Sequence, residues 1–163
     1  MENEKQIRSC STAVVSVEIE IEADLRTTWE SMVGDIGSWW RSDFLICEES
    51  KGMTLEPRVG GLLRERTAKE GCGYAWGQII WFQPETHLAY LAQIVPPWGR
   101  PAQSVVQIAL AEMANGRTKL TLTDAIIDNL TDEFLESLDE GWRQLYGEGV
   151  LKSYVESKGG KGV

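Results

Sequence analysis

The sequence predicts an α+β domain, and three of its features carry that prediction. Apolar and polar residues alternate over residues 15–22, which is typical of a half-buried strand in an antiparallel sheet. Strand and turn signals then continue to about residue 123. Residues 131–156 carry apolar side chains at the three- and four-residue spacing of an amphipathic helix. A sheet closed by a single long helix favours a functional site between the two layers.

The first part of the chain is expected to leave the sheet and return to it. Asp24 offers an N-cap oxygen for a short helix over residues 25–33. Glycines at 34 and 37 bracket a second short helix that reaches a pair of tryptophans. Residues 44–47 and 53–55 are weaker strand candidates, and a turn rich in proline and glycine precedes a strand over residues 62–67.

The middle of the chain predicts two hairpins. Residues 74–82 and 88–94 form strands joined by a four-residue turn, and residues 105–110 and 118–123 form strands around Asn115-Gly116. The segment between the hairpins, residues 96–101, contains three prolines, which indicates a connecting loop. Together these elements predict a sheet of six or seven strands.

Glycines interrupt the predicted C-terminal helix. Gly141, Gly147 and Gly149 each cost about 1 kcal/mol against alanine at an ordinary interior position of a helix. Small residues at these positions indicate either a close approach of the sheet or space left for a bound molecule. Asp139 and Arg143 are spaced for an ion pair on the exposed face of the helix.

The composition restricts the class of partner. The chain of 163 residues carries 25 acidic and 16 basic side chains, and this charge disfavours nucleic acid and anionic membrane surfaces. The sequence shows no signal peptide and no membrane span, so we expect a cytoplasmic protein. We expect one domain over residues 13–157, with flexible tails at residues 1–12 and 158–163.

Residue types that carry catalysis are sparse. The three cysteines are widely separated and form no Cys-x-x-Cys pair, so we expect no disulfide framework, no metal and no cofactor. His87, the single histidine, precedes a predicted strand, where a structural role is favoured. Glu65 is the one candidate for acid-base chemistry, because strand alternation places it with Leu63 toward the interior. The alternative is that Glu65 pairs with a strand neighbour at the surface.

Several local patterns follow one another along the chain in a characteristic order. They are residues 17–29, Trp39-Trp40, Arg58-Val59-Gly60-Gly61, residues 77–84 with Leu88 and Tyr90, residues 118–123, and Gly141-Trp142 with Leu145 and Tyr154. In this order they resemble the SRPBCC superfamily, also called START-like or helix-grip proteins, and the match is closest to single-domain proteins of the family named after the activator of the heat-shock protein 90 ATPase. The resemblance covers nearly the whole chain.

This resemblance implies a curved sheet wrapped around the last helix, with an apolar cavity between them. The implied cavity residues are Trp39, Trp40, Ile79, Trp81, Tyr90, Trp98, Trp142, Leu145 and Tyr146. For several of them, packing in the core is the alternative role, and Trp98 could instead anchor its own loop. Of the tryptophans at 39 and 40, one is expected to line the cavity and the other to anchor the short helices.

Two tryptophans on one strand point to opposite faces of the sheet unless a bulge intervenes. Trp76 and Trp81 differ in parity along residues 74–82. The family pattern places Gly77 and Ile79 inward, and therefore Trp81 inward and Trp76 outward. An outward tryptophan would be covered either by a second copy of the chain in a homodimer or by a loop of its own chain.

Three functions are consistent with the resemblance. The first is binding of a small, largely apolar or aromatic molecule in the cavity. The second is a cyclase or aromatase-like enzyme, which requires a buried ionisable residue such as Glu65 facing the cavity. The third is a protein-interaction module related to co-chaperones, which requires a filled interior and an exposed apolar patch near Trp76 or Trp98. The chaperone activator uses a separate N-terminal domain that this sequence lacks, which argues against chaperone stimulation.

Overall fold

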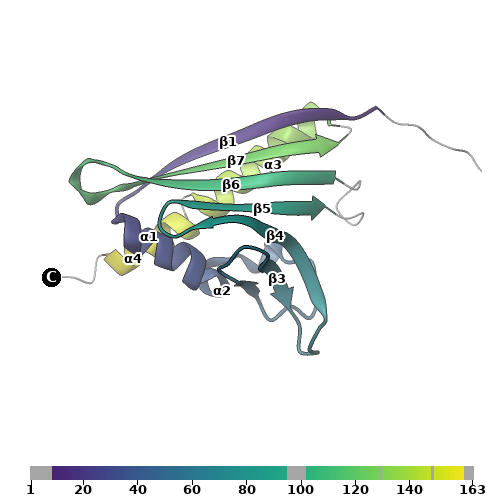
Figure 1. Ribbon diagram of the computed structural model, residues 1–163, viewed down its shortest axis with the longest axis horizontal. Coiled ribbons are helices and arrows are strands. Elements are labelled where there is room, and N and C mark those ends of the chain that lie inside the picture. The colour runs from purple at the N-terminus through teal and green to yellow at the C-terminus, as the bar shows by residue number, and fades with distance from the viewer. Residues whose placement is uncertain (1–8, 95–101, 129, 148, 160–163) are drawn as a thin grey trace, which may run out of the picture.

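The computed structural model describes residues 9–94, 102–128, 130–147 and 149–159 and consists of one antiparallel sheet with helices on its concave side (Figure 1). The sheet has seven strands in the order β1-β7-β6-β5-β4-β3-β2. Their bounds are β1 (Ser11–Ile21), β2 (Met53–Leu55), β3 (Leu62–Arg66), β4 (Gly73–Gln83), β5 (His87–Ile94), β6 (Ala102–Glu112) and β7 (Thr118–Asp128). The α-helices are α1 (Leu25–Trp29), α2 (Ile36–Trp39), α3 (Asp132–Tyr146) and α4 (Leu151–Gly159). The predicted α+β helix-grip fold is confirmed.

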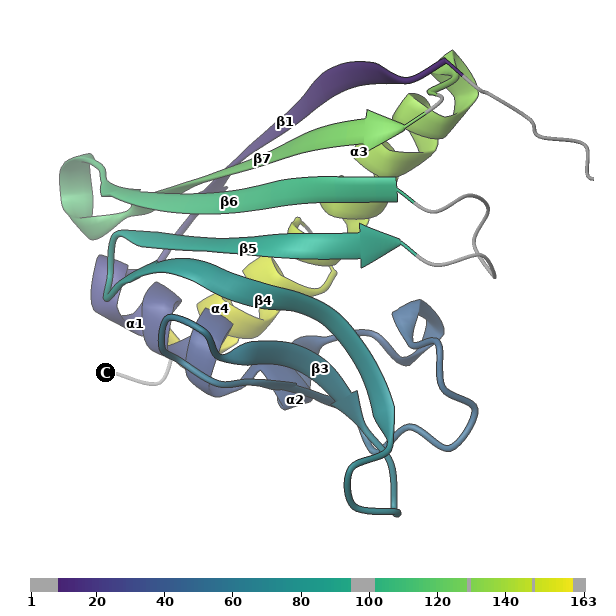
Figure 2. The ribbon, with the colours of Figure 1, turned by 45° about the vertical axis from the view of Figure 1, so that its right-hand side comes forward.

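Alternation along each strand separates a buried face from an exposed one. In β1 the even positions are exposed from Ser16 onward, while Val17 and Ile21 are at most 1% exposed. Cross-strand partners extend this face across the sheet, since Val17 lies opposite Leu122 and Leu122 lies opposite Ile108. The concave face is therefore a continuous apolar surface, and α3 and α4 pack over it (Figure 2).

The two short helices after β1 form as the sequence predicts. Asp24 caps α1, because its Oδ1 accepts a hydrogen bond of 2.7 Å from the backbone N–H of Thr27. Beyond Trp29 the chain continues as a π-helical turn over Glu30–Gly34 and then enters α2. These segments contact α4 and β2.

The C-terminal helix is not continuous, contrary to the expectation of one helix over residues 131–156. It consists of α3 and α4, separated at Gly147 and Gly149. A Cβ at Gly147 would lie 2.3 Å from the carbonyl oxygen of Arg143, and Gly149 has a φ of +92°. Both positions therefore favour glycine, so two of the three helix glycines mark a break.

Two β-bulges in β4 reverse the predicted orientations of its tryptophans. The register of β3 with β4 shifts around Trp76, and the register of β4 with β5 shifts around Ile80. As a result Trp76 packs against the core inside the sheet, whereas Trp81 is 45% exposed and stacks on His87 with ring centroids 4.5 Å apart. The prediction of an inward Trp81 and an outward Trp76 is wrong.

Other differences from the expected elements are small. Residues 44–47 do not form a strand; a single 3-10 turn over Ser42–Phe44 precedes an irregular segment. Strand β1 begins two residues before the expected start of the domain at residue 13, and α4 ends at Gly159. Among the described residues, no helix has the length and apolar character needed to span a bilayer.

Candidate ligand cavity

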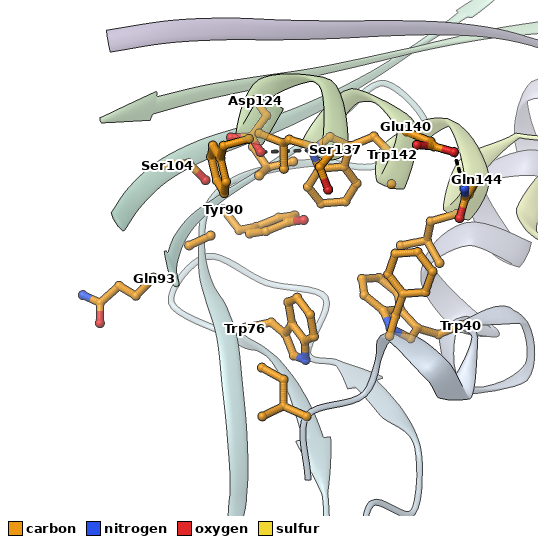
Figure 3. Close-up of a pocket in the computed structure, with 18 of the residues that line it drawn as sticks. Trp40, Trp76, Tyr90, Gln93, Ser104, Asp124, Ser137, Glu140, Trp142 and Gln144 are labelled. Atoms are coloured by element: carbon orange, nitrogen blue, oxygen red, sulfur yellow. Dashed lines mark hydrogen bonds between the residues drawn. The ribbon is translucent and has the colours of Figure 1, made fainter. Parts of the chain in front are cut away.

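A cavity of about 460 Å³ lies between the concave face of the sheet and α3 (Figure 3). This volume is within the range of roughly 300 to 1,000 Å³ that is usual for small-molecule sites. Strands β4 to β7 form one wall, α3 forms the opposite wall, and the segment 40–46 that follows α2 forms a third. Gly141 is on the wall formed by α3, where a Cβ would lie 3.8 Å from Phe44, at ordinary contact distance.

Aromatic rings make up much of the lining. Seven of them border the cavity: Trp40, Phe44, Tyr74, Trp76, Tyr90, Phe134 and Trp142. Trp76 is held edge-on between two of the others, with ring centroids 5.6 Å from Trp40 and 5.6 Å from Tyr74. Such packing fixes the rings and leaves a rigid, mainly apolar wall for a guest molecule.

One end of the cavity carries a buried carboxylate. Asp124 lies on the inner face of β7 opposite Val106, is 1% exposed, and accepts a hydrogen bond of 3.0 Å at Oδ2 from the indole N–H of Trp142. Its Oδ1 is buried and accepts no hydrogen bond from the described residues. Burial raises the pKa of the Asp124 carboxyl, and the neighbouring Ser104 hydroxyl and Trp142 indole oppose that rise.

Further polar atoms border the cavity at other points. The Tyr90 hydroxyl points into it, and burial raises the pKa of this phenol well above its ordinary value of 10.0 (Figure 3). Trp40, at the far end from Asp124, has a buried indole N–H without an acceptor among the described residues. Asp124 Oδ1 and the Trp40 indole N–H are thus buried polar atoms, at opposite ends of the cavity, that have no hydrogen-bond partner among the described residues.

Glu65 is buried outside the cavity and accepts hydrogen bonds from residues that form the cavity wall. It is 1% exposed and accepts hydrogen bonds from the backbone N–H of Ile46 at 2.7 Å and of Cys47 at 2.9 Å. It also accepts a bond of 2.9 Å from the indole N–H of Trp76. Ile46 and Trp76 both line the cavity, whereas Glu65 does not. The alternative of a surface ion pair is wrong, and the carboxylate positions two wall residues.

The residues expected to form the site are only partly brought together. Trp40, Tyr90, Trp142 and Leu145 line the cavity. Trp39, Ile79 and Tyr146 are buried beside it, and Trp39 packs edge-on against Tyr146 with ring centroids 5.5 Å apart. Trp81 is on the outer face, and Trp98 lies outside the described residues. The role of each as a ligand contact stays a prediction.

Sequence reasoning missed Asp124, Ser104, Trp76 and Phe134 as cavity residues. For Asp124 a signal is present, because the alternation of Leu120 and Leu122 continues to Asp124 and then to Ile126. No group of three or more His, Cys, Asp or Glu side chains among the described residues is arranged to hold a metal ion.

The comparisons with known proteins agree with this geometry. The family model described as "Activator of Hsp90 ATPase homolog 1-like protein" matches residues 35–156. The chain belongs to this family. The match supports the AHSA-like SRPBCC assignment, a group known for ligand binding and for polyketide cyclase-like members. The comparison with curated proteins found no match.

Solved structures share the fold at low sequence identity. A putative uncharacterized protein from Rhizobium leguminosarum is 19% identical with a TM-score of 0.68, covering 93% of this chain and 99% of its own. Mll3558 from Rhizobium loti is 17% identical with a TM-score of 0.64, covering 93% and 99%. DynU16, a putative protein in the dynemicin biosynthetic locus, is 16% identical with a TM-score of 0.60; the match covers 91% of this chain and 48% of that one. These likenesses establish the fold alone.

Proposed function

We propose that this protein binds a small, largely aromatic or apolar molecule in the cavity between the sheet and α3. The observation that carries the proposal is a cavity of about 460 Å³ lined by seven aromatic rings. A site of this size and character can enclose most of a small ligand, while a few polar groups orient it. A co-chaperone-like module would instead require a filled interior and an exposed apolar patch near Trp76 or Trp98. Trp76 packs against the core inside the sheet.

The cyclase or aromatase-like alternative, which requires a buried ionisable residue facing the cavity, does not rest on Glu65. The oxygens of Glu65 accept hydrogen bonds from two backbone N–H groups and the Trp76 indole. A carboxylate with three donors at this depth is engaged in holding structure. Asp124 is the buried carboxylate on the cavity wall through which such a reaction would have to run.

The proposal is tested by filling the cavity from α3. The probe is N-phenyl-1-naphthylamine, an apolar aromatic dye whose fluorescence rises in a dry site. Wild type and Gly141→Ala are expected to bind it, because the added methyl meets only Phe44 at 3.8 Å. Gly141→Phe places a ring in the cavity and is expected to abolish binding while unfolding cooperatively in urea.

Two outcomes would overturn the proposal. Equal dye binding by Gly141→Phe and wild type would place the dye elsewhere, and absence of binding to folded wild type would show that the cavity is not a site. Native mass spectrometry of protein purified from its own host extends the test, because a retained ligand is expected to appear as a fixed mass increment. Gly141→Phe purified in the same way is the control and is expected to lack the increment.

A further inference from the structure

The charges that border the cavity are of one sign. None of the described lining residues is a lysine, arginine or histidine, while Asp124 and Glu140 are carboxylates at its inner end and its rim. Glu140 is exposed and accepts a hydrogen bond of 3.0 Å from Gln144, so water screens it. Asp124 is 1% exposed, so its charge acts at low effective dielectric.

Asp124 is incompletely satisfied by the protein itself. Its Oδ2 accepts the Trp142 indole N–H, but its Oδ1 accepts no hydrogen bond from the described residues. A buried carboxylate oxygen without a donor is costly unless another group supplies one. A bound molecule with a positively charged N–H group would supply both the donor and the opposite charge.

The aromatic walls favour the same kind of group. The faces of tryptophan and tyrosine rings carry negative electrostatic potential and attract cations. Tyr90 of β5 and Trp142 of α3 lie beside Asp124, and Trp76 of β4 lines the cavity on the other side of Tyr90. The net charge of −9 on the whole chain adds a field that draws cations toward the protein.

We infer that the ligand is an arylalkylamine, with its nitrogen on an alkyl carbon, that binds as a cation with its ammonium group at the Asp124 end of the cavity. This inference rests on the proposed function and adds the chemical class of the ligand. The aromatic body of the amine occupies the space between α3 and the sheet. Anionic amphiphiles such as fatty acids are disfavoured.

Three probes of nearly the same shape test this inference. They are 1-naphthylmethylamine, 1-naphthalenemethanol and 1-naphthoate, titrated into wild type at pH 7 and followed by calorimetry. The amine is expected to bind at least about tenfold more tightly than the alcohol, which corresponds to about 1.4 kcal/mol, and the carboxylate most weakly. In Asp124→Asn the amine is expected to lose about tenfold, while the alcohol changes by less than about twofold. Glu136→Gln, an exposed carboxylate on α3 that does not line the cavity, is the matched control and is expected to leave the amine preference within about threefold.

The outcomes separate this inference from the proposed function. Equal binding of all three probes, or tighter binding of the alcohol or carboxylate, would overturn the amine assignment and leave the cavity proposal standing. An amine preference that survives in folded Asp124→Asn would also overturn it. If Asp124→Asn does not fold, the ranking of the three probes on wild type still decides whether the ligand is an amine. Failure of every probe to bind folded wild type would overturn both proposals.

Discussion

Replacing Asp124 by asparagine is expected to stabilise the protein at neutral pH. The side chain is 1% exposed, and the ionised form leaves Oδ1 buried without a donor. Such a group costs about 1 to 3 kcal/mol, and the hydrogen bond that Oδ2 accepts from the Trp142 indole offsets part of the burial cost of the carboxylate. Asparagine keeps an acceptor for Trp142 and carries no charge, so we expect a gain of about 1 to 2 kcal/mol in the free energy of unfolding at pH 7. For a chain of this length that is a rise of roughly 2 to 8 °C in Tm.

The gain should depend on pH in a defined direction. Burial raises the pKa of the Asp124 carboxyl above its ordinary value of 3.8 in the folded state. The protonated carboxyl is therefore better tolerated in the folded state than the ionised one. The stability that protonation gives relative to the ionised form is fully present below about pH 3.8 and is lost as pH rises through the folded-state pKa. Asparagine does not titrate, so the difference between variant and wild type should be smallest at pH 3 and grow toward pH 7.

Urea unfolding from pH 3 to pH 7, followed by far-ultraviolet circular dichroism, measures this difference. Glu136→Gln, an exposed carboxylate on α3, is the control and should stay within about 0.5 kcal/mol of wild type throughout. If Asp124→Asn is less stable than wild type at pH 7, or if its advantage is the same at pH 3 and pH 7, the assignment of Asp124 as a costly buried charge is wrong.

Three further substitutions test the walls of the cavity. Glu65→Gln exchanges one acceptor oxygen for a donor NH₂, so we expect the free energy of unfolding in urea to fall by about 1 to 3 kcal/mol and the Trp76 indole N–H to exchange faster. Unchanged exchange would argue against a positioning role of Glu65. Gly77→Ala would set a Cβ 2.6 Å from Cδ2 of Tyr90, so we expect the free energy of unfolding to fall by about 1 to 3 kcal/mol and probe binding to weaken. A variant as stable as wild type would contradict this close approach. Trp81→Ala removes a 45% exposed ring from the outer face of the sheet, so dye binding should be unchanged and the free energy of unfolding should fall by less than about 1.5 kcal/mol. Loss of dye binding would contradict a site on the inner face.

Periodicity in the sequence predicts the fold well because it reflects burial directly. The alternation over Val15 to Ile21 corresponds to one buried face of β1, and the turn at Asn115-Gly116 joins β6 to β7. The cap at Asp24 is equally local, since it depends on one side chain and the N–H of Thr27, three residues ahead. Features that depend on near neighbours could therefore be predicted without knowledge of the rest of the chain.

The site is predicted less well because it depends on irregularities in the sheet. The bulges at Trp76 and Ile80 are set by the pairing of β4 with β3 and β5. A prediction from alternation along β4 alone therefore assigns Trp81 to the wrong face of the sheet. The helix break at Gly147 could have been predicted from its glycine spacing, but an amphipathic pattern continues across it. Asp124 was predictable in principle, since it interrupts an inward apolar series, yet the predicted strand ended at residue 123.

The indole N–H signals of the tryptophans offer the most direct test that the cavity is the binding site. The chain has seven tryptophans, and their ¹H–¹⁵N signals can be assigned with single Trp→Phe variants. On saturation with 1-naphthalenemethanol, the signals of Trp40, Trp76 and Trp142 should shift, because these rings line the cavity. Those of Trp29, packed on Phe82, and Trp81, on the outer face, should not move. Shifts confined to Trp81, or no shift at the three lining indoles when the alcohol binds, would contradict a ligand site between the sheet and α3.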